Sequence, residues 1–372
     1  MIKINILSPG RFHVLDLARE LSKNGYDVKF YSFVPTKRVK KFGLHKENNV
    51  SLFYLLLPFL FLAKKAFKKA DWSQKLLIIA QDCLTGTLMR KCDVCIALSG
   101  NYIYSVKKAK EQGSTIIIER GSKHILDQAK ILREIKGIRT KENEKPNFYI
   151  RREIESYQLA DYIAVASQHV YNSFIKHHFD AKKLFVNPYG VDLSMFSYQP
   201  QIEKKYDVIM VGGWSYRKGC DLIVDAIKQS HYTFLHVGSI VDFDFPNDSQ
   251  FSHVPSVDQK ELVNYYNQAK IFVLPSREEG LAMVQAQAIA CNLPLVGSKD
   301  SGAEDLQKLV DKPEYITIIE DYSPKALLKA IKVAMDNANN PIMGGYAGNA
   351  IRNLTWEAYG KRYSDFLRKI QS

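Results

Sequence analysis

The sequence lacks an apolar run long enough to cross a membrane. Its longest candidate, LFYLLLPFLFLA at 52–63, is interrupted by Pro58, whereas a membrane-spanning helix needs about 20 apolar residues. The beginning of the chain, MIKINIL, already has the pattern of a β-strand, and no small-residue cleavage site follows it. We therefore expect a cytoplasmic protein, and the sequence leaves open a peripheral position on the inner face of the cell membrane.

Cysteine is also scarce, with five in 372 residues. An odd number fits a reducing compartment better than a disulfide framework. Cys92 and Cys95 form a C-x-x-C, but no second cysteine pair or histidine pair accompanies it, so we interpret both as small buried residues on a strand. The D-x-D within DFDFPND (242–248) falls in a surface-like loop. The sequence thus predicts neither a metal site nor another cofactor.

Charge is abundant but unevenly distributed. Apolar residues make up 46% and charged residues 24% of the chain, which is a globular composition, and the length suggests two domains. Residues 1–195 hold 33 Lys and Arg against 18 Asp and Glu, net +15, whereas 196–372 are close to neutral at −2. We expect the first half to meet an anionic partner other than nucleic acid.

Strands and helices alternate along the chain, and the alternation starts twice. Apolar strands are expected at 2–8, 93–98, 115–119 and 161–167, then again at 206–213, 233–239, 270–276 and 293–298. This pattern predicts an α/β fold with two Rossmann-like domains and a cleft between them. We place the domains at 1–195 and 196–355, and we expect a final helix at 356–372 to cross back onto the first domain.

One candidate site follows the first strand of the second domain, in VGGWSYRKGCD (211–221). Gly212 and Gly213 stand at the strand end, and Arg217 and Lys218 precede a helix. A diphosphate is bound by backbone N–H groups, a helix N-terminus and cations. The spacing is neither that of a Walker A loop nor G-x-G-x-x-G, and a solvated basic turn is the alternative.

A second candidate site is PSREEGLAMVQAQA (275–288). Stabilisation of the helix dipole accounts for one acidic residue in the first turn, but not for two. Glu279 is followed by Gly280, Leu281 and Ala282, whose N–H groups are open to a ligand, and Gln287 lies two helical turns beyond on the same face. Carboxylates beside amide donors suit a ligand rich in hydroxyl groups, such as a sugar. Both sites follow strand ends, where parallel sheets bind ligands.

Taken together, these segments resemble the retaining, nucleotide-sugar-dependent glycosyltransferases of the GT-B fold, family 4. Residues 160–196 are similar to the interdomain signature, 211–227 to the phosphate turn, 273–306 to the E-x7-E segment and 119–125 to a segment of the N-terminal domain. The resemblance covers nearly the whole chain, and the E-x7-E segment is its most specific part.

The resemblance implies a role for each candidate residue of the second domain. Arg217 and Lys218 would hold the donor diphosphate, and Glu279 would meet the hydroxyls of the donor sugar. The amides from Gly280 through Met283 to Val284 would lie near the sugar and phosphate. The second Glu of the family, which binds the ribose, is Gln287 here. Gly213 stands where an Arg is usual.

In the first domain the resemblance assigns fewer residues. The family's glycine pair is reduced to Gly10 alone. His124 would approach the transferring sugar, although a histidine at a helix start without a ligand is the alternative. His13 also starts a helix, and residues there are more often part of the cap region.

Residues 52–69 combine an apolar stretch with a basic one that includes Lys64, Lys65, Lys68 and Lys69. They can form a buried element with a solvated lysine tail, or an interfacial segment that contacts anionic lipid phosphates. Family members often glycosylate lipid-linked acceptors, and their N-terminal domain binds the acceptor.

The resemblance therefore implies transfer of a sugar, with retention and without a metal, from a nucleotide diphosphate sugar to a hydroxyl of a glycan or lipid-linked acceptor. Cell-surface polysaccharide or glycolipid synthesis is the expected setting. Two alternatives stay open at this point. One is another GT-B enzyme, such as a sugar-nucleotide epimerase. The other is a non-catalytic binding module with a degenerate donor site, for which Gly213 and Gln287 leave room.

Overall fold

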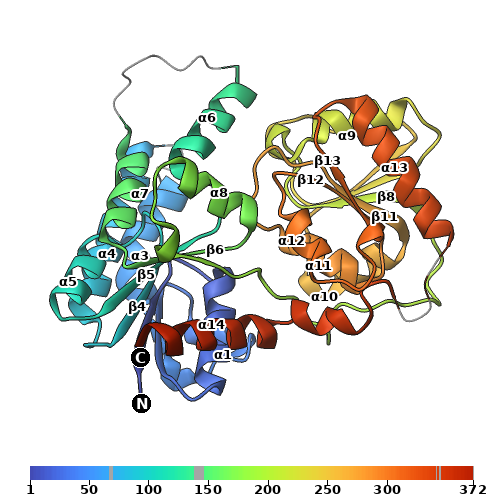
Figure 1. The fold of residues 1–372 in the computed structure, drawn as a ribbon. Helices are drawn as coiled ribbons and strands as arrows, with labels where there is room; N and C mark the ends of the chain where they lie inside the picture. Colours follow the sequence, from blue (N-terminus) through green and yellow to red (C-terminus); the bar gives the residue numbers. More distant parts are fainter. Residues whose placement is uncertain (67–69, 138–145, 341, 343–344, 372) are drawn as a thin grey trace.

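The computed structural model describes residues 1–66, 70–137, 146–340, 342 and 345–371. Its strands form two separate parallel sheets, one of seven strands and one of six, and helices cover both faces of each (Figure 1). We call the two halves the N-terminal and the C-terminal lobe. This is the expected α/β architecture.

The N-terminal lobe contains the sheet β3-β2-β1-β4-β5-β6-β7. Its strands are β1 (Lys3–Leu7), β2 (Asp27–Ser32), β3 (Asn49–Ser51), β4 (Val94–Leu98), β5 (Thr115–Arg120), β6 (Tyr162–Val165) and β7 (Leu184–Val186). Its helices are α1 (Phe12–Lys23), α2 (Thr36–Lys40), α3 (Phe53–Phe61), α4 (Asp71–Leu88), α5 (Tyr104–Glu111), α6 (Ile125–Ile135), α7 (Phe148–Leu159) and α8 (Gln168–Lys176).

The C-terminal lobe contains the sheet β10-β9-β8-β11-β12-β13. Its strands are β8 (Tyr206–Val211), β9 (Phe234–Val237), β10 (Phe251–Val254), β11 (Ala269–Leu274), β12 (Leu295–Ser298) and β13 (Ile316–Ile319). Its helices are α9 (Cys220–Lys228), α10 (Gln259–Asn267), α11 (Met283–Ala290), α12 (Ala303–Gln307) and α13 (Pro324–Asn339). In each sheet the strand order reverses beside the first strand, between β1 and β4 and between β8 and β11, and such switch points are where α/β sheets bind ligands.

The eight expected strands are all present, with shorter ends than the apolar pattern suggested. The strands that the pattern did not predict include all four sheet edges: β3, β7, β10 and β13. Each has only three or four residues, and each is less buried than the central strands. A central parallel strand is covered on both faces and reads as a continuous apolar run, whereas a short edge strand does not.

The two lobes are joined by two chain segments that touch each other. Val191 pairs with Thr355 in an isolated β-bridge. A Cβ added to Gly190 would lie 2.5 Å from the backbone nitrogen of Trp356, so only glycine fits at this crossing. The second segment continues into α14 (Trp356–Gln371), which packs on α1, and both chain ends lie on the N-terminal lobe (Figure 1).

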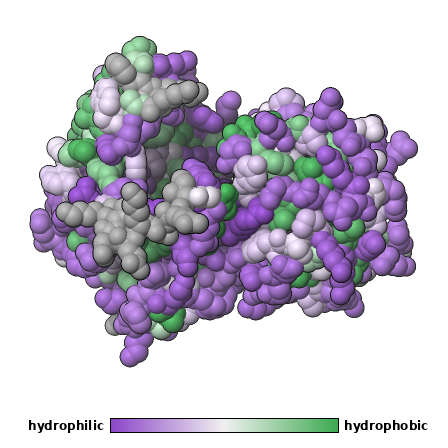
Figure 2. Space-filling model, turned by 90° about the horizontal axis from the view of Figure 1, so that it is seen from above, coloured by the Kyte–Doolittle hydropathy of each residue, from purple (hydrophilic) through white to green (hydrophobic). Residues whose placement is uncertain are grey.

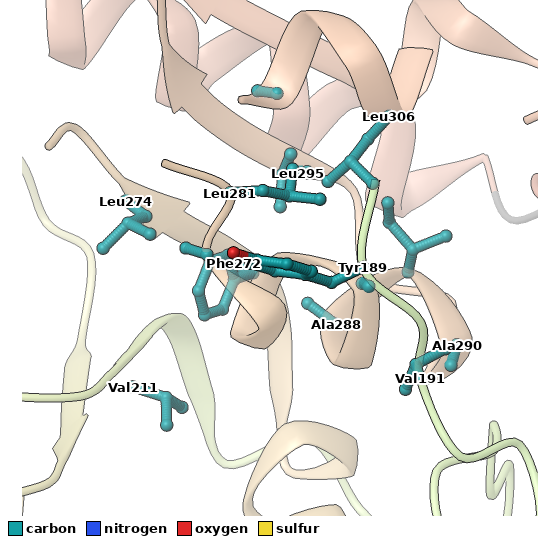
Figure 3. Close-up of a cluster of buried hydrophobic side chains, with 14 of the residues drawn as sticks. Tyr189, Val191, Val211, Phe272, Leu274, Leu281, Ala288, Ala290, Leu295 and Leu306 are labelled. Atoms are coloured by element: carbon teal, nitrogen blue, oxygen red, sulfur yellow. The ribbon is translucent and has the colours of Figure 1, made fainter. Parts of the chain in front are cut away.

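The crossing segments also connect the two hydrophobic cores. Tyr189 and Val191 of the first segment belong to the same buried cluster as Leu281 and Ala288 of the C-terminal lobe (Figure 3). Tyr359 of α14 belongs to it as well. The cluster continues into both sheets, so the lobes are packed against each other rather than tethered.

The apolar stretch at 52–66 has one buried and one exposed face. Leu52, Leu56 and Leu60 are buried, but Tyr54 is 79% and Phe61 is 61% exposed. Pro58 lies within α3, and Lys64 and Lys65 follow in a π-helical turn, Leu62–Ala66. Lys68 and Lys69 lie outside the described residues. Among the described helices, none has the length and apolar character needed to cross a membrane.

Candidate active site

The loops after β8 and β11 lie side by side because these strands are neighbours in the sheet. Gly212 and Gly213 follow β8, and Gly212 has a φ of 128°, which favours glycine. Arg217 and Lys218 lie on the 3-10 turn Tyr216–Lys218, directly before α9. A Cβ on Gly219 would lie 2.4 Å from the carbonyl oxygen of Pro275, so the two loops are in direct contact.

Arg217, Lys218 and Glu279 form a charged group at this place. Lys218 Nζ lies 2.8 Å and Arg217 Nη1 lies 3.6 Å from Glu279 Oε2. Burial would raise the pKa of Glu279, but the two cations outweigh that effect and lower the pKa below its usual value. Glu279 is therefore a carboxylate at neutral pH. The cations expected to meet a diphosphate are, in this arrangement, held by the carboxylate expected to meet a sugar.

Glu278, which the sequence analysis did not select, holds Arg217 from behind. Arg217 Nη1 lies 3.2 Å from Glu278 Oε2 and donates to the Glu278 carbonyl oxygen at 2.9 Å. Glu278 is fully buried, and its Oε1 has no hydrogen-bond partner among the described residues, as is true of Ser276 Oγ. Buried polar atoms are nearly always paired, with ordered water where no protein group reaches them.

The loop from Gly280 leads into α11, with Ala282 in the N-cap position and no side-chain cap. The first N–H groups of α11 are therefore not satisfied by a capping side chain. Leu281 and Ala282 are buried, Met283 is partly exposed, and the Val284 carbonyl accepts a hydrogen bond from Tyr266. The geometry is suited to an anion or a sugar oxygen at the start of the helix.

Gln287 lies at the bottom of the cleft. Its Oε1 accepts a hydrogen bond from the Tyr266 hydroxyl at 3.0 Å. With Met283 it lines a cavity of about 250 Å³ between the lobes, and Arg11 and His13 line the same cavity from the N-terminal lobe. Figure 2 looks down on the furrow that separates the lobes. The structure thus brings Gln287 opposite the beginning of α1.

His13 belongs to this cleft rather than to a solvated helix start. It is buried, its Nε2 lies 2.9 Å from Glu119 Oε2, and its ring stacks on Tyr189 at 4.3 Å between centroids. Glu119 Oε1 accepts a hydrogen bond from Tyr363 of α14 at 2.7 Å. Glu119 begins the segment 119–125 named in the sequence analysis, but nothing in the local pattern connects it with residues 106 and 244 positions away.

His124 does not join this group. It is the N-cap of α6, where its Nδ1 accepts from the Leu126 N–H, and it stacks on His177 at 4.1 Å. Burial, and then the neighbouring His177, lowers its pKa to about 4. The described contacts of its side chain all lie within the N-terminal lobe, which corresponds to the helix-start alternative.

Several hydrogen bonds hold the loop at 279–281 against the N-terminal lobe. His169 Nε2 lies 2.8 Å from the carbonyl oxygen of Glu279, and Ser167 Oγ donates to the carbonyl oxygen of Gly280. Lys123 Nζ and Asp300 Oδ1 form an ion pair of 2.6 Å across the lobes. A Cβ on Gly280 would lie 1.8 Å from the Gly121 carbonyl oxygen. The N-terminal lobe therefore positions the loop that carries Glu279.

Gly10 follows β1 at the switch point of the first sheet, and its N–H donates to Ser8 Oγ. The loop at 242–248 packs on the phosphate turn, where Asp242 accepts from the Tyr216 N–H. Within the described ranges, no group of three or more His, Cys, Asp or Glu side chains is arranged to hold a metal ion.

The two-lobed architecture with this cleft is the GT-B fold. Along its whole length the chain superposes on sucrose-phosphate synthase from Thermosynechococcus elongatus, with a TM-score of 0.69, 15% identity and 99% of that chain covered. It also superposes on the Anabaena protein HepE, solved in complex with UDP and glucose, with a TM-score of 0.66, 12% identity and 100% of that chain covered. At these identities the likeness establishes the fold.

A family model matches the sequence of the C-terminal lobe. Residues 205–337 match the model of the glycosyl transferases group 1 family. An uncharacterized glycosyltransferase of Methanocaldococcus jannaschii is 28% identical over 107 residues, which are 26% of this chain and 30% of the relative.

The glycosyltransferase CapM of Staphylococcus aureus, named for capsular polysaccharide biosynthesis, is 26% identical over 153 residues, which are 40% of this chain and 36% of the relative. The chain thus spans about a third of the length of these curated relatives.

Proposed function

We propose that the protein is a glycosyltransferase that moves a sugar from a nucleoside diphosphate sugar to a hydroxyl group. One observation carries the proposal: Lys218 and Arg217 meet Glu279 at the switch point of the C-terminal sheet, facing the N-terminal lobe. In this proposal the cations bind the leaving diphosphate, and the neighbouring carboxylate accepts hydrogen bonds from the sugar hydroxyls. The group 1 family match and the GT-B fold support the proposal.

The charged group suggests how the donor enters. A diphosphate carries more negative charge than one carboxylate, so we expect Lys218 to move from Glu279 to the phosphates when the donor binds. Glu279 is then free to accept hydrogen bonds from the sugar. As the bond to the sugar breaks, Arg217, Lys218 and the first N–H groups of α11 stabilise the growing charge on the diphosphate. These groups supply the positive charge for that step, so we propose that it needs no metal.

The proposal includes retention at the sugar carbon, by front-face attack in which a donor phosphate oxygen takes the acceptor proton. It rests on the resemblance of 273–306 to the E-x7-E segment of retaining enzymes. Analysis of the anomeric configuration of the product by NMR would test it, and an inverted product would overturn it.

For the acceptor we propose a glycan or a lipid-linked sugar of cell-surface polysaccharide or glycolipid synthesis. The net charge of +15 in residues 1–195 and the name of CapM support this class. The exposed side chains Tyr54 and Phe61, next to Lys64 and Lys65, support a peripheral contact of the N-terminal lobe with an anionic membrane.

The donor half is tested by calorimetry with UDP, GDP and ADP, followed by assays with the matching nucleotide sugars in buffer containing EDTA. We expect one nucleoside diphosphate to bind best, and its sugar to be transferred at an unchanged rate with EDTA. If none of the three binds, the protein is not a nucleotide-sugar enzyme. If EDTA stops transfer and a divalent metal restores it, the metal-free step is wrong.

A further inference from the structure

A second cavity, of about 460 Å³, lies in the N-terminal lobe between α3 and the loop after β2. Its walls are mainly apolar and come from both elements: Phe33, Val34, Pro35, Phe53, Leu57, Leu60 and Phe61. None of these side chains takes part in the candidate active site. The cavity can therefore accept an apolar chain without disturbing the charged group at Glu279.

Cations surround this apolar cavity. Arg11, Arg38, Lys64 and Lys65 also line it. The side chains of Arg38 and Lys65 make no ion pair and no hydrogen bond with any described residue. The Arg11 guanidinium lies over the Phe42 ring at 3.7 Å and donates to Gln259 Oε1 at 3.4 Å, but forms no ion pair with a described carboxylate. Cations without a carboxylate partner around an apolar cavity are complementary to a ligand with an anionic end and an apolar body.

The cavity and the interdomain cleft share one residue. Arg11 lines both, and Gly10 before it and Phe12 after it line one each. Phe12 is exposed and has a φ of 34°, which is strained for a residue with a side chain. A ligand that extends from the cavity past Arg11 would therefore reach the space in front of Gln287 and Met283.

We propose that this cavity holds the apolar chain of a phosphate-bearing lipid, and that the lipid is the acceptor. Arg11 and Arg38 would bind the phosphate, and the remainder of the lipid would point into the cleft. This inference deepens the proposed function, because it names the acceptor class and the residues that select it. A neutral lipid would leave the cations without an anion, and a free sugar would leave the apolar walls empty.

The binding test uses the full chain and three probes in calorimetry below micelle-forming concentrations: farnesyl phosphate, farnesol and inorganic phosphate. We expect farnesyl phosphate to bind, and each of the other two to bind at least about tenfold more weakly, since each lacks one of the two features. Equal binding of farnesol, equal binding of inorganic phosphate, or no binding of farnesyl phosphate would each overturn the proposal.

Two matched pairs of variants locate the binding. Leu57→Glu places a charge in the cavity wall, and Leu55→Glu places the same charge two residues away on α3, where the side chain is 54% exposed and outside the cavity. Arg38→Gln removes a lining cation, and Lys37→Gln removes its exposed neighbour. We expect Leu57→Glu and Arg38→Gln to weaken farnesyl phosphate binding about tenfold or more, and the two controls to leave it unchanged.

If Leu55→Glu and Leu57→Glu weaken farnesyl phosphate binding equally, the proposed cavity site is wrong, because the lipid would then contact only the outer surface of α3. Binding of nucleoside diphosphates is measured on the same variants and should not change. If the donor proposal is wrong, the unmodified protein will bind no nucleoside diphosphate. Failure of the cavity proposal would appear only with the farnesyl probes, so the two are distinguishable.

Discussion

The ends of equivalent strands are used differently in the two lobes. In the C-terminal lobe, the loops after β8 and β11 present partly buried charges to the cleft. In the N-terminal lobe, the corresponding region around β1 and β5 presents buried groups, His13 and Glu119, which are paired with each other and with α14. The charged loops are suited to a ligand that changes its charge during a reaction, whereas the paired side chains form a fixed wall against which that ligand is held.

The largest effect on the rate of transfer should follow the removal of the Lys218 side chain. We expect Lys218→Ala to lower kcat for transfer by about 10²–10³-fold, because a cation that stabilises developing negative charge contributes a few kcal/mol. Lys228→Ala, at the exposed end of α9, is the matched control. Equal rates of the two variants would show that the charged group at Glu279 does not act on the leaving diphosphate.

Adding a single methyl group at Gly280 should break the contact between the loop at 279–281 and the N-terminal lobe. Gly280→Ala brings a Cβ to 1.8 Å from the Gly121 carbonyl oxygen, so the loop and the N-terminal lobe must separate. We expect a loss of transfer of about tenfold or more, with both lobes still folded by circular dichroism. Gly121→Ala, whose Cβ would meet only the Tyr189 hydroxyl at 3.1 Å, should cost less. The reverse order would show that the closed arrangement is not needed for transfer.

Acid should destabilise both lobes through buried histidines, among them His124 and His236. Burial lowers the pKa of His124 in the N-terminal lobe and of His236 in the C-terminal lobe to about 4. The unfolded chain takes up these protons near pH 6.5, so the stability that the neutral rings contribute is fully present above that pH and is lost as the pH falls from 6.5 towards 4.

The loss is at most about 1.4 kcal/mol per pH unit for each histidine. His124→Asn keeps a good helix N-cap and should flatten the dependence of the thermal midpoint on pH between 6.5 and 4.5. An unchanged slope would mean that His124 is solvated in the folded protein.

The smallest expected effect concerns Gln287. We expect Gln287→Leu to weaken nucleoside diphosphate binding by about 0.5–1.5 kcal/mol, the contribution of a neutral hydrogen bond, and Gln287→Glu to preserve or strengthen it. Glu279→Gln should instead reduce transfer far more than nucleotide binding. Calorimetry beside transfer rates separates the two, and the opposite outcome for both residues would reverse their assignments.

The sequence predicted which charged residues meet in the C-terminal lobe better than which residues meet in the N-terminal lobe, for a physical reason. Arg217, Lys218 and Glu279 lie in two short loops after apolar strands, so the pattern of the chain itself places them at one edge of a sheet. Glu278 was missed because nothing in the local pattern tells which of two adjacent acids is buried, although its burial behind Arg217 makes it the more costly of the two to leave unpaired.

In the N-terminal lobe the contacts depend on residues that are far apart in sequence. Glu119 meets His13 and Tyr363, and neither spacing leaves a periodic signal. The same limit affected the fold, where the central strands were predicted and the short edge strands were not. The composition of residues 52–66 did not show whether this segment is buried or exposed. In the structure, α3 has one buried face and one exposed face.

The position of α14 sets the order in which the chain can fold during synthesis. The strands of the C-terminal lobe and their covering helices lie within residues 206–339, so this lobe can close as soon as they have left the ribosome. The N-terminal lobe is made first but finishes last, because α1 keeps an uncovered apolar face until α14 has been synthesised. We expect a released chain truncated after residue 355 to carry a protease-resistant C-terminal lobe beside an N-terminal half that is still readily cleaved.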